Sequence, residues 1–150
     1  MKAPRRIGEL LAAAGLITEE QLERALEAQR DADKRLGAIL VEQGLVTEVQ
    51  LTQILSNQLS VAWVSLPHVD FFPELLSLVP VDVARELVLI PAHFRRGQHG
   101  EKILYIAMDD PTNVPAMERI AQLTGMHVRP LIAPRSEIIA AIDREYDDAS

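Results

Sequence analysis

The sequence predicts an α+β protein in which an N-terminal bundle of two tandem helical hairpins precedes a small α/β layer with a short sheet. Two observations lead to this prediction. A stretch of 24 residues, 6–29, recurs without a gap as residues 35–58, and 11 of the aligned positions are identical. After the repeat, short apolar runs alternate with helical patterns and with turns rich in Pro and Gly. A fixed repeat of this size marks a duplicated supersecondary unit, and the mixed pattern after it is typical of an α+β layer.

Each repeat predicts a short helix, a tight turn and a longer helix. In the first copy the short helix ends at Gly15, because glycine adopts the left-handed conformation that closes a helix. The longer helix begins at Thr18, and Gln21 lies three residues later, as in a capping box. The second copy has the same residues at its helix ends, and Gly44 ends its short helix. Two such hairpins are expected to form a small helical bundle.

An arginine precedes the short helix in both copies, and helix packing does not explain it. Arg6 and Arg35 face the positive end of a helix dipole, which is mildly unfavourable for a cation. Each lies two residues before a glycine, Gly8 or Gly37, which we expect to leave the backbone open. A guanidinium beside exposed amides suits a phosphate group. The alternative is that both arginines are solvated surface charges.

The tandem pattern Arg-Leu/Ile-Gly-x-x-Leu-x-x-x-Gly-x-x-x-x-x-x-Leu-x-x-x-Leu-x-x-Gln resembles the MshEN-type domain. This is the N-terminal domain of type II secretion and type IV pilus ATPases, and it binds the bacterial second messenger cyclic di-GMP. The one departure is Ile7, where the family usually has Leu. The linker-like segment between Leu78 and Pro91 also resembles the family.

The resemblance implies a binding site made of two half-sites for a ligand that is itself two-fold symmetric. Arginine pairs with guanine O6 and N7, glycine allows close approach, and glutamine adds hydrogen bonds. The leucines are ambiguous, because leucine at helical spacing is more often core than a platform for a base. The implied ligand residues are Arg6, Ile7, Gly8, Leu22, Leu26 and Gln29 in the first copy, and Arg35, Leu36, Gly37, Leu51, Leu55 and Gln58 in the second.

After the repeat, the sequence predicts elements of both kinds. We divide the chain into a helical tandem-repeat subdomain (1–59), a linker with short helices (60–90) and a small α+β subdomain (91–150). Residues 61–66 read as a strand or an extended linker, and Pro80 starts a short helix. The later elements are extended segments at 88–90 and 92–95, a strand at 103–108, a helix at 114–124, a strand at 128–132 and a closing helix at 136–146, capped by Ser136.

The turn between the second strand and the helix contains Asp109 and Asp110, followed by Pro. The family has an Asp-Pro at this place, so the resemblance implies that Asp110 contacts guanine, whose N1–H and N2–H₂ both suit a carboxylate acceptor. Asp109 is the alternative residue for this contact. The alternative is that both aspartates make the turn and cap the next helix. The sequence does not decide whether Arg85, Arg95 or Arg96 reaches the ligand.

Composition excludes several classes of function. The net charge of −7 argues against DNA binding, and the lack of cysteine rules out disulfides and thiolate metal sites. The four histidines lack metal-ligand spacing, and no phosphate-binding loop of the G-x-x-x-x-G-K-[ST] type occurs. No stretch approaches the length of a membrane helix, and the N-terminus lacks the apolar run of a secretory signal. We therefore expect a cytoplasmic, non-catalytic protein that needs no metal or cofactor.

These observations lead to one functional hypothesis and one alternative. The hypothesis is a sensor that binds one cyclic di-GMP through both repeats and regulates a secretion, pilus or related bacterial system. Its other expected partners are an ATPase domain or components of such a machine. The alternative is a protein-docking module of the same machines that binds no nucleotide.

Overall fold

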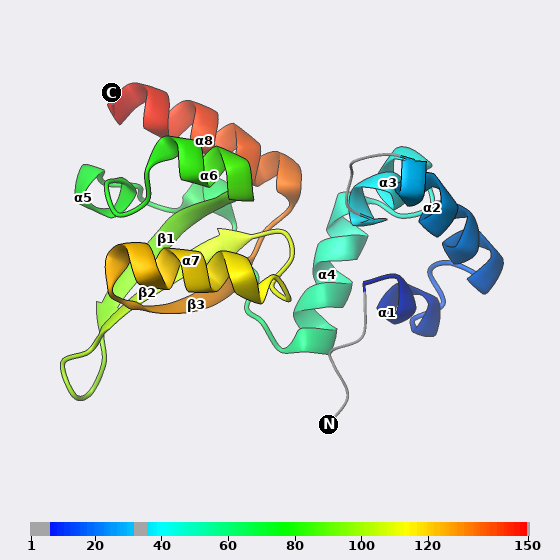
Figure 1. Cartoon of the computed structure of the whole chain (residues 1–150), viewed down its shortest axis with the longest axis horizontal. Coiled ribbons are helices and arrows are strands. Elements are labelled where there is room, and N and C mark those ends of the chain that lie inside the picture. Colours follow the sequence, from blue (N-terminus) through cyan, green and yellow to red (C-terminus); the bar gives the residue numbers. More distant parts are fainter. Residues whose placement is uncertain (1–6, 32–35, 150) are drawn as a thin grey trace. The chain divides into compact units, whose positions relative to one another are not determined.

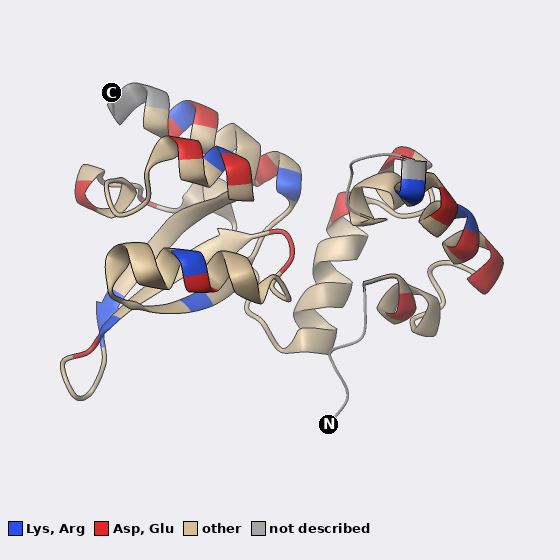
Figure 2. Ribbon diagram, in the orientation of Figure 1, with Lys and Arg blue, Asp and Glu red and all other residues tan. Residues whose placement is uncertain are grey.

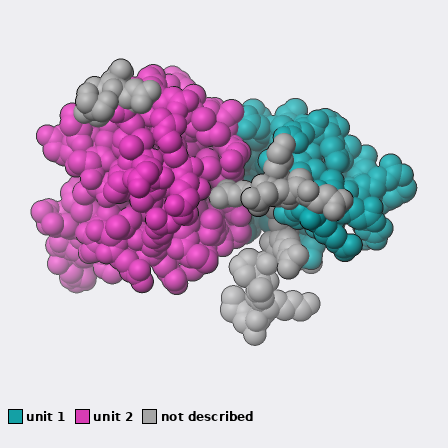
Figure 3. Space-filling model, turned by 45° about the horizontal axis from the view of Figure 1, so that its top comes forward, with its two compact units in different colours: residues 1–60 teal, residues 61–150 magenta. Residues whose placement is uncertain are grey.

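The protein divides into two compact units, residues 1–60 and 61–150, in a computed structural model that describes residues 7–31 and 36–149 (Figures 1 and 3). Side chains are described for residues 8–30 and 36–146. Helices form the first unit, and helices with a three-stranded sheet form the second. The predicted α+β class, with helical hairpins before a short sheet, is therefore confirmed.

The first unit contains two helical hairpins. Helices α1 (Ile7–Ala13) and α2 (Glu19–Asp31) make the first, and α3 (Leu36–Glu42) and α4 (Glu48–Leu59) make the second. Helix α1 contacts the other three helices, and α2 also contacts α3. Their shared core holds Leu11, Ile17, Ala25, Leu36, Ile39, Leu40 and Val46.

The helix boundaries of both hairpins follow from local hydrogen bonds. Thr18 Oγ1 accepts from the amide of Gln21 at 3.0 Å, and Gln21 Oε1 accepts from the amide of Thr18 at 2.9 Å. Thr47 and Gln50 repeat both bonds at the same distances. The glycines that follow the two short helices have φ of +79° and +74°, in the left-handed region. Both predicted capping boxes and both predicted glycine stops are confirmed.

The second unit has a sheet with strand order β1-β2-β3. Strand β1 (Leu89–Arg96) is antiparallel to β2 (Lys102–Met108), and β2 is parallel to β3 (His127–Ile132). The helical elements are η1 (Leu66–His68), α5 (Pro73–Leu76), α6 (Val81–Leu87), α7 (Val114–Thr124) and α8 (Arg135–Ala149).

Most of these elements lie where the sequence predicts them, and α7 has the predicted bounds. Helix α8 begins one residue before its predicted cap, so the prediction for Ser136 is wrong. The carbonyl of Pro134 accepts from the amide of Ile138 at 3.1 Å, which makes Pro134 the first residue to close a helical turn. Ser136 therefore lies inside the first turn.

The helices of the second unit share one core against the sheet. Helices α5, α6 and α8 contact β1, α8 also contacts β2, and α7 contacts β3. Arg119 of α7 pairs with Glu86 of α6 at 2.5 Å, so these two helices are neighbours. Leu104 and Ile106 of β2 are fully buried in the same core as Ile120 of α7. One face of the sheet therefore carries the helical layer.

Residues 61–90, predicted as a linker with short helices, supply part of this core through Leu66, Leu75 and Val79. Trp63 forms an isolated parallel bridge with Ile132 at the end of β3. The three-part division of the chain stays a prediction, whereas the structure has two units.

Candidate functional site

Both arginines of the repeat lie outside the described residues. The structure shows that α1 begins at Ile7 and α3 at Leu36, the positions that directly follow Arg6 and Arg35 in the sequence. The two arginines therefore stay predicted ligand contacts.

Gly8 is buried rather than open. A Cβ built on Gly8 would overlap Cδ1 of Leu22 and would lie 2.8 Å from Cδ2 of Leu36. The absence of a side chain therefore lets α2 and α3 pack closely against α1. Gly37, at the same position of the second copy, is also buried. This packing role differs from the open backbone that the sequence suggested.

The four leucines of the longer helices are not equivalent. Leu22 and Leu26 of α2 are half-buried, and so is Leu51 of α4. Leu55, which aligns with Leu26 in the repeat, is fully buried. The half-buried leucines have surface left to contact a ligand, whereas Leu55 has the environment of a core residue.

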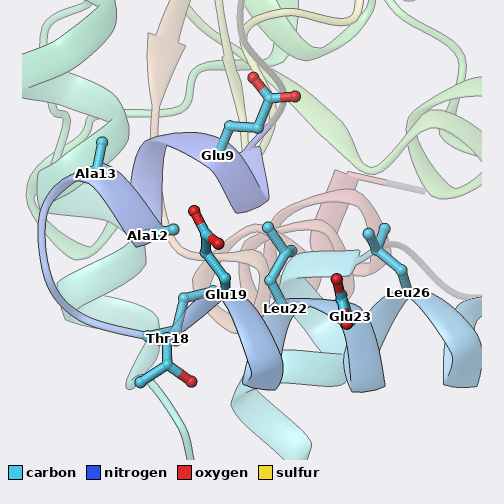
Figure 4. A pocket seen from close by; sticks show the side chains of 9 residues that line it. Glu9, Ala12, Ala13, Thr18, Glu19, Leu22, Glu23 and Leu26 are labelled. Carbon is cyan, nitrogen blue, oxygen red and sulfur yellow. The ribbon is translucent and has the colours of Figure 1, made fainter.

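A groove of about 580 Å³ lies beside the first hairpin, and half-buried leucines of the predicted site line it (Figure 4). Leu22 and Leu26 lie side by side on α2 in the close-up view. The remaining lining residues are Glu9, Ala12, Ala13, Ile17, Thr18, Glu19 and Glu23. The groove therefore has apolar walls and three carboxylates.

The carboxylates make the groove unsuitable for phosphate groups, because like charges repel at close range. They can instead accept hydrogen bonds from N–H donors such as the guanine edge. Two of the three are absent from the second copy, where Ala38 stands at the position of Glu9 and Thr52 at that of Glu23. The second copy keeps only Glu48, at the position of Glu19, so the second hairpin has fewer carboxylates at the matching positions.

The two glutamines end their repeats near the C-terminal ends of the longer helices. Gln29 is half-buried in α2, and Gln58 is exposed in α4. An exposed amide can reach a ligand without rearrangement, so Gln58 remains a predicted contact, as does Gln29.

Asp110 belongs to the second unit, where the turn after β2 engages its carboxylate. Its Oδ1 accepts from the amide of Thr112 at 3.0 Å and from the Thr112 hydroxyl at 2.5 Å. The cap of α7 is Asn113, whose Oδ1 accepts from the amide of Ala116 at 3.2 Å. Asp110 makes the turn, as the alternative expects, but the helix cap that the alternative assigned to the aspartates is wrong. The contact of Asp110 with guanine stays a prediction.

Asp109, the alternative residue for the guanine contact, has a different neighbour. Its Oδ2 lies 3.6 Å from Nη1 of Arg135 at the start of α8, and its side chain is 15% exposed. Asn113, the cap of α7, was not predicted from the sequence. The Pro after Val114 was an available signal, because proline is frequent in the first turn of a helix.

Two of the three arginines left undecided by the sequence have local contacts in the second unit. Arg85 of α6 donates to Asp143 of α8 at 2.6 Å. Arg95 donates through Nε to the hydroxyl of Tyr105 at 3.1 Å. Arg96 is exposed at the end of β1.

Neither a metal cluster nor a membrane helix is found in the described part of the chain. Within residues 7–31 and 36–149, no three His, Asp or Glu side chains are placed to hold a metal ion. No helix of the same residues is long and apolar enough to cross a membrane.

Comparison with known proteins identifies the family. The sequence model of the MshEN domain matches residues 59–150. The chain belongs to the MshEN domain family. The resemblance inferred from the tandem repeat is thereby confirmed, although the matched segment begins where the repeat ends.

MshEN relatives include much longer ATPases. The chain is 36% identical over 141 residues to the type IV pilus assembly ATPase PilB of Myxococcus xanthus, covering 94% of this chain and 24% of the relative. It is 31% identical over 144 residues to PilB of Thermus thermophilus, covering 96% of this chain and 16% of the relative. The chain thus spans a quarter or less of the length of these relatives.

Solved structures show the same MshEN fold over nearly the whole chain. A structure of MshE with cyclic di-GMP has a TM-score of 0.76 and 32% identity, covering 95% of this chain and all of that one. The N-terminal domain of XpsE has a TM-score of 0.74 at 20% identity, covering 96% of this chain and 98% of that one, and supports the fold alone.

Proposed function

We propose that this MshEN domain is a non-catalytic sensor that binds one cyclic di-GMP through its two repeats. Through this binding it regulates a secretion, pilus or related bacterial machine, in association with an ATPase domain or other components of that machine. The observation that carries the proposal is the 32% identity over 95% of the chain to MshE, whose structure was solved with this ligand.

The groove of the first hairpin supports this proposal for a base rather than for a phosphate. Leu22 and Leu26 offer half-buried aliphatic surface beside an open volume of about 580 Å³. The neighbouring carboxylates can accept from the N–H groups of guanine, and they repel phosphate. The phosphates then depend on Arg6 and Arg35, since a guanidinium donates two parallel hydrogen bonds to such a group.

The proposed stoichiometry follows from the symmetry of the ligand. Cyclic di-GMP has two identical halves, and the chain has two copies of the motif. One ligand is therefore expected for each chain, with one half-site for each half of the ligand.

Calorimetric titration of the 150-residue chain with cyclic di-GMP tests the proposal. We expect one ligand per chain. Arg6→Ala and Arg35→Ala should each weaken binding by about 1.5–3 kcal/mol, the scale of a charge-assisted hydrogen bond. Arg5→Ala is the matched control, because it removes the same charge one residue outside the repeat and should leave affinity nearly unchanged.

Three outcomes would contradict this picture. Two ligands per chain would rule out one ligand shared between the half-sites. An arginine variant that binds like the parent chain would remove that arginine from the site. Equal losses in Arg5→Ala and Arg6→Ala would mean that general charge, rather than a placed guanidinium, attracts the ligand.

The acidic groove also favours a second candidate function, that of a protein-docking module that binds no nucleotide. Its apolar walls and three carboxylates would suit a basic segment of a partner, and the second copy lacks two of those carboxylates. No binding of cyclic di-GMP at high micromolar concentration would favour this candidate over the sensor.

A further inference from the structure

The sheet of the second unit has a second face, which differs in chemistry from the helical face. Alternate residues of a strand point to opposite faces. Leu104 and Ile106 of β2 are fully buried in the core that the helices share. Ile103 and Tyr105 therefore belong to the opposite face. Ile103 is buried but is not part of that core cluster, whereas Ala107, further along the same face, is.

The strand register places two basic side chains beside Tyr105 on this opposite face. Tyr105 is aligned with His93 of β1 and with Arg129 of β3. Side chains that are directly opposite each other in neighbouring strands share a face. His93 and Arg129 are both exposed, whereas Tyr105 is half-buried. The rings of His93 and Tyr105 lie 5.7 Å apart, so the aromatic side chain is flanked by positive or N–H-bearing groups.

The next row of the same face repeats this arrangement around an aliphatic residue. Ile103 is aligned with Arg95 of β1 and with His127 of β3, and both of these are exposed. The Arg95 guanidinium lies 5.7 Å from the centre of the Tyr105 ring and donates to its hydroxyl through Nε. These contacts link the two rows and fix the position of the ring.

We call these six residues the basic sheet face: His93, Arg95, Ile103, Tyr105, His127 and Arg129. Strands lie about 4.8 Å apart and alternate residues about 7 Å apart, so the four outer side chains bound a rectangle of roughly 10 by 7 Å. Figure 2 shows basic residues on β1 and β3, whereas acidic residues are frequent on the helices. The face contains no carboxylate, in a chain whose net charge is −7.

We propose that the basic sheet face docks a short acidic segment of a partner protein. Carboxylates of the segment would meet Arg95 and Arg129, and one apolar side chain would lie against Tyr105, between the two arginines. The histidines add hydrogen-bond donors at the remaining corners. A rectangle of this size fits a few residues of peptide. A long polyanion would extend past a rectangle of this size, which favours a short peptide over nucleic acid.

The binding of a defined peptide to the whole chain tests this proposal by fluorescence anisotropy. The probe is a labelled ten-residue peptide with four glutamates around one central leucine. We expect saturable binding that weakens as salt is raised, because the contacts are exposed charges. Arg95→Ala/Arg129→Ala should weaken it by about tenfold or more, on the scale of two charge-assisted contacts. The single variant Arg129→Glu should also weaken it, and it leaves the bond between Arg95 and Tyr105 in place.

Matched controls separate this face from general charge. Arg24→Ala/Arg30→Ala removes two exposed arginines from α2, and it should leave peptide affinity unchanged. Replacing the four glutamates of the peptide with glutamine should abolish binding, and replacing its leucine with serine should weaken it several-fold. Melting curves should show that all variants are folded.

Several results would overturn the proposal. Equal affinity of the parent chain and Arg95→Ala/Arg129→Ala would exclude the face as the docking site, as would equal losses in the α2 control. Unchanged affinity for the serine peptide would exclude the apolar contact with Tyr105. Tighter binding of a ten-nucleotide oligothymidylate than of the peptide, at the same salt concentration, would assign the face to nucleic acid instead. Because none of these measurements uses cyclic di-GMP, their results are independent of whether the chain is a cyclic di-GMP sensor.

Discussion

Gly8→Ala tests whether the glycine of the motif is required for packing. The new Cβ would overlap Leu22 Cδ1 and lie 2.8 Å from Leu36 Cδ2. Overpacking of this kind costs about 1–3 kcal/mol. Replacing glycine with alanine in a helix gains up to about 1 kcal/mol. The difference predicts a net loss of up to about 2 kcal/mol in the free energy of unfolding, measured by urea denaturation.

A double-mutant cycle with Leu22→Ala identifies the cause of this loss. Truncation of Leu22 removes the atom that the new Cβ would overlap, so Gly8→Ala should cost much less in the Leu22→Ala background. We expect a coupling free energy of about 0.5 kcal/mol or more, the size typical of residues in contact. Additivity of the two substitutions would refute the packing role of Gly8. Affinity for cyclic di-GMP should also fall in Gly8→Ala, because Leu22 would be displaced toward the groove.

Leu55→Ala should lower the free energy of unfolding by about 2–5 kcal/mol, because Leu55 is fully buried. Leu26→Ala, at the matching position of the first copy, should cost less stability but reduce affinity for cyclic di-GMP. Asp110→Ala should cost about 1 kcal/mol for its lost turn hydrogen bonds, and it should weaken ligand binding more than Asp109→Ala if Asp110 contacts guanine. Burial raises the pKa of Tyr146 above its ordinary value of 10.0. Stability should therefore be complete below pH 10 and fall by up to about 1.4 kcal/mol per pH unit above it, relative to Tyr146→Phe.

Each of these expectations has a contrary outcome. Equal stability losses in the two leucine variants, with unchanged affinity in both, would assign both side chains to the core. Equal affinities of the two aspartate variants would remove Asp110 from the proposed site. Parallel stability curves of the parent chain and Tyr146→Phe between pH 9 and 11 would show that the tyrosine hydroxyl does not titrate differently on unfolding.

Local chemistry made the helix boundaries of the two hairpins predictable. A Thr and a Gln three residues apart satisfy each other's backbone wherever they occur, so the caps at Thr18 and Thr47 could be inferred without tertiary structure. A glycine at a helix end is similarly local, as at Gly125, whose φ is +70°.

The different environments of Leu26 and Leu55 could not be predicted, because the repeat gives both positions the same sequence signal. Burial depends instead on neighbours, and these differ between the two hairpins. Helix α4 packs on α1, whereas α2 packs on both α1 and α3. Tertiary context therefore breaks a symmetry that the sequence repeat implies.

The role of each residue in the turn after β2 could not be predicted from the sequence, for a different reason. Aspartate and asparagine both favour turns and helix caps, so composition predicts the turn but not the assignment. The structure assigns the cap to Asn113 and the turn hydrogen bonds to Asp110. The basic sheet face was likewise hidden, because it requires the register of three strands.

The bridge between Trp63 and Ile132 has a consequence for the order in which the chain acquires its fold during synthesis. The amide of Val64 donates to the carbonyl of Ile132 at 3.0 Å, and the amide of Ile132 donates to the carbonyl of Ala62 at 2.9 Å. Ala62 and Val64 therefore cannot form these two hydrogen bonds until Ile132, roughly 70 residues later, has left the ribosome. Residues 1–60, which hold the two hairpins, form a compact unit of their own. Local contacts form early and distant pairings late. The repeat should therefore be folded while the sheet that follows it is still being made.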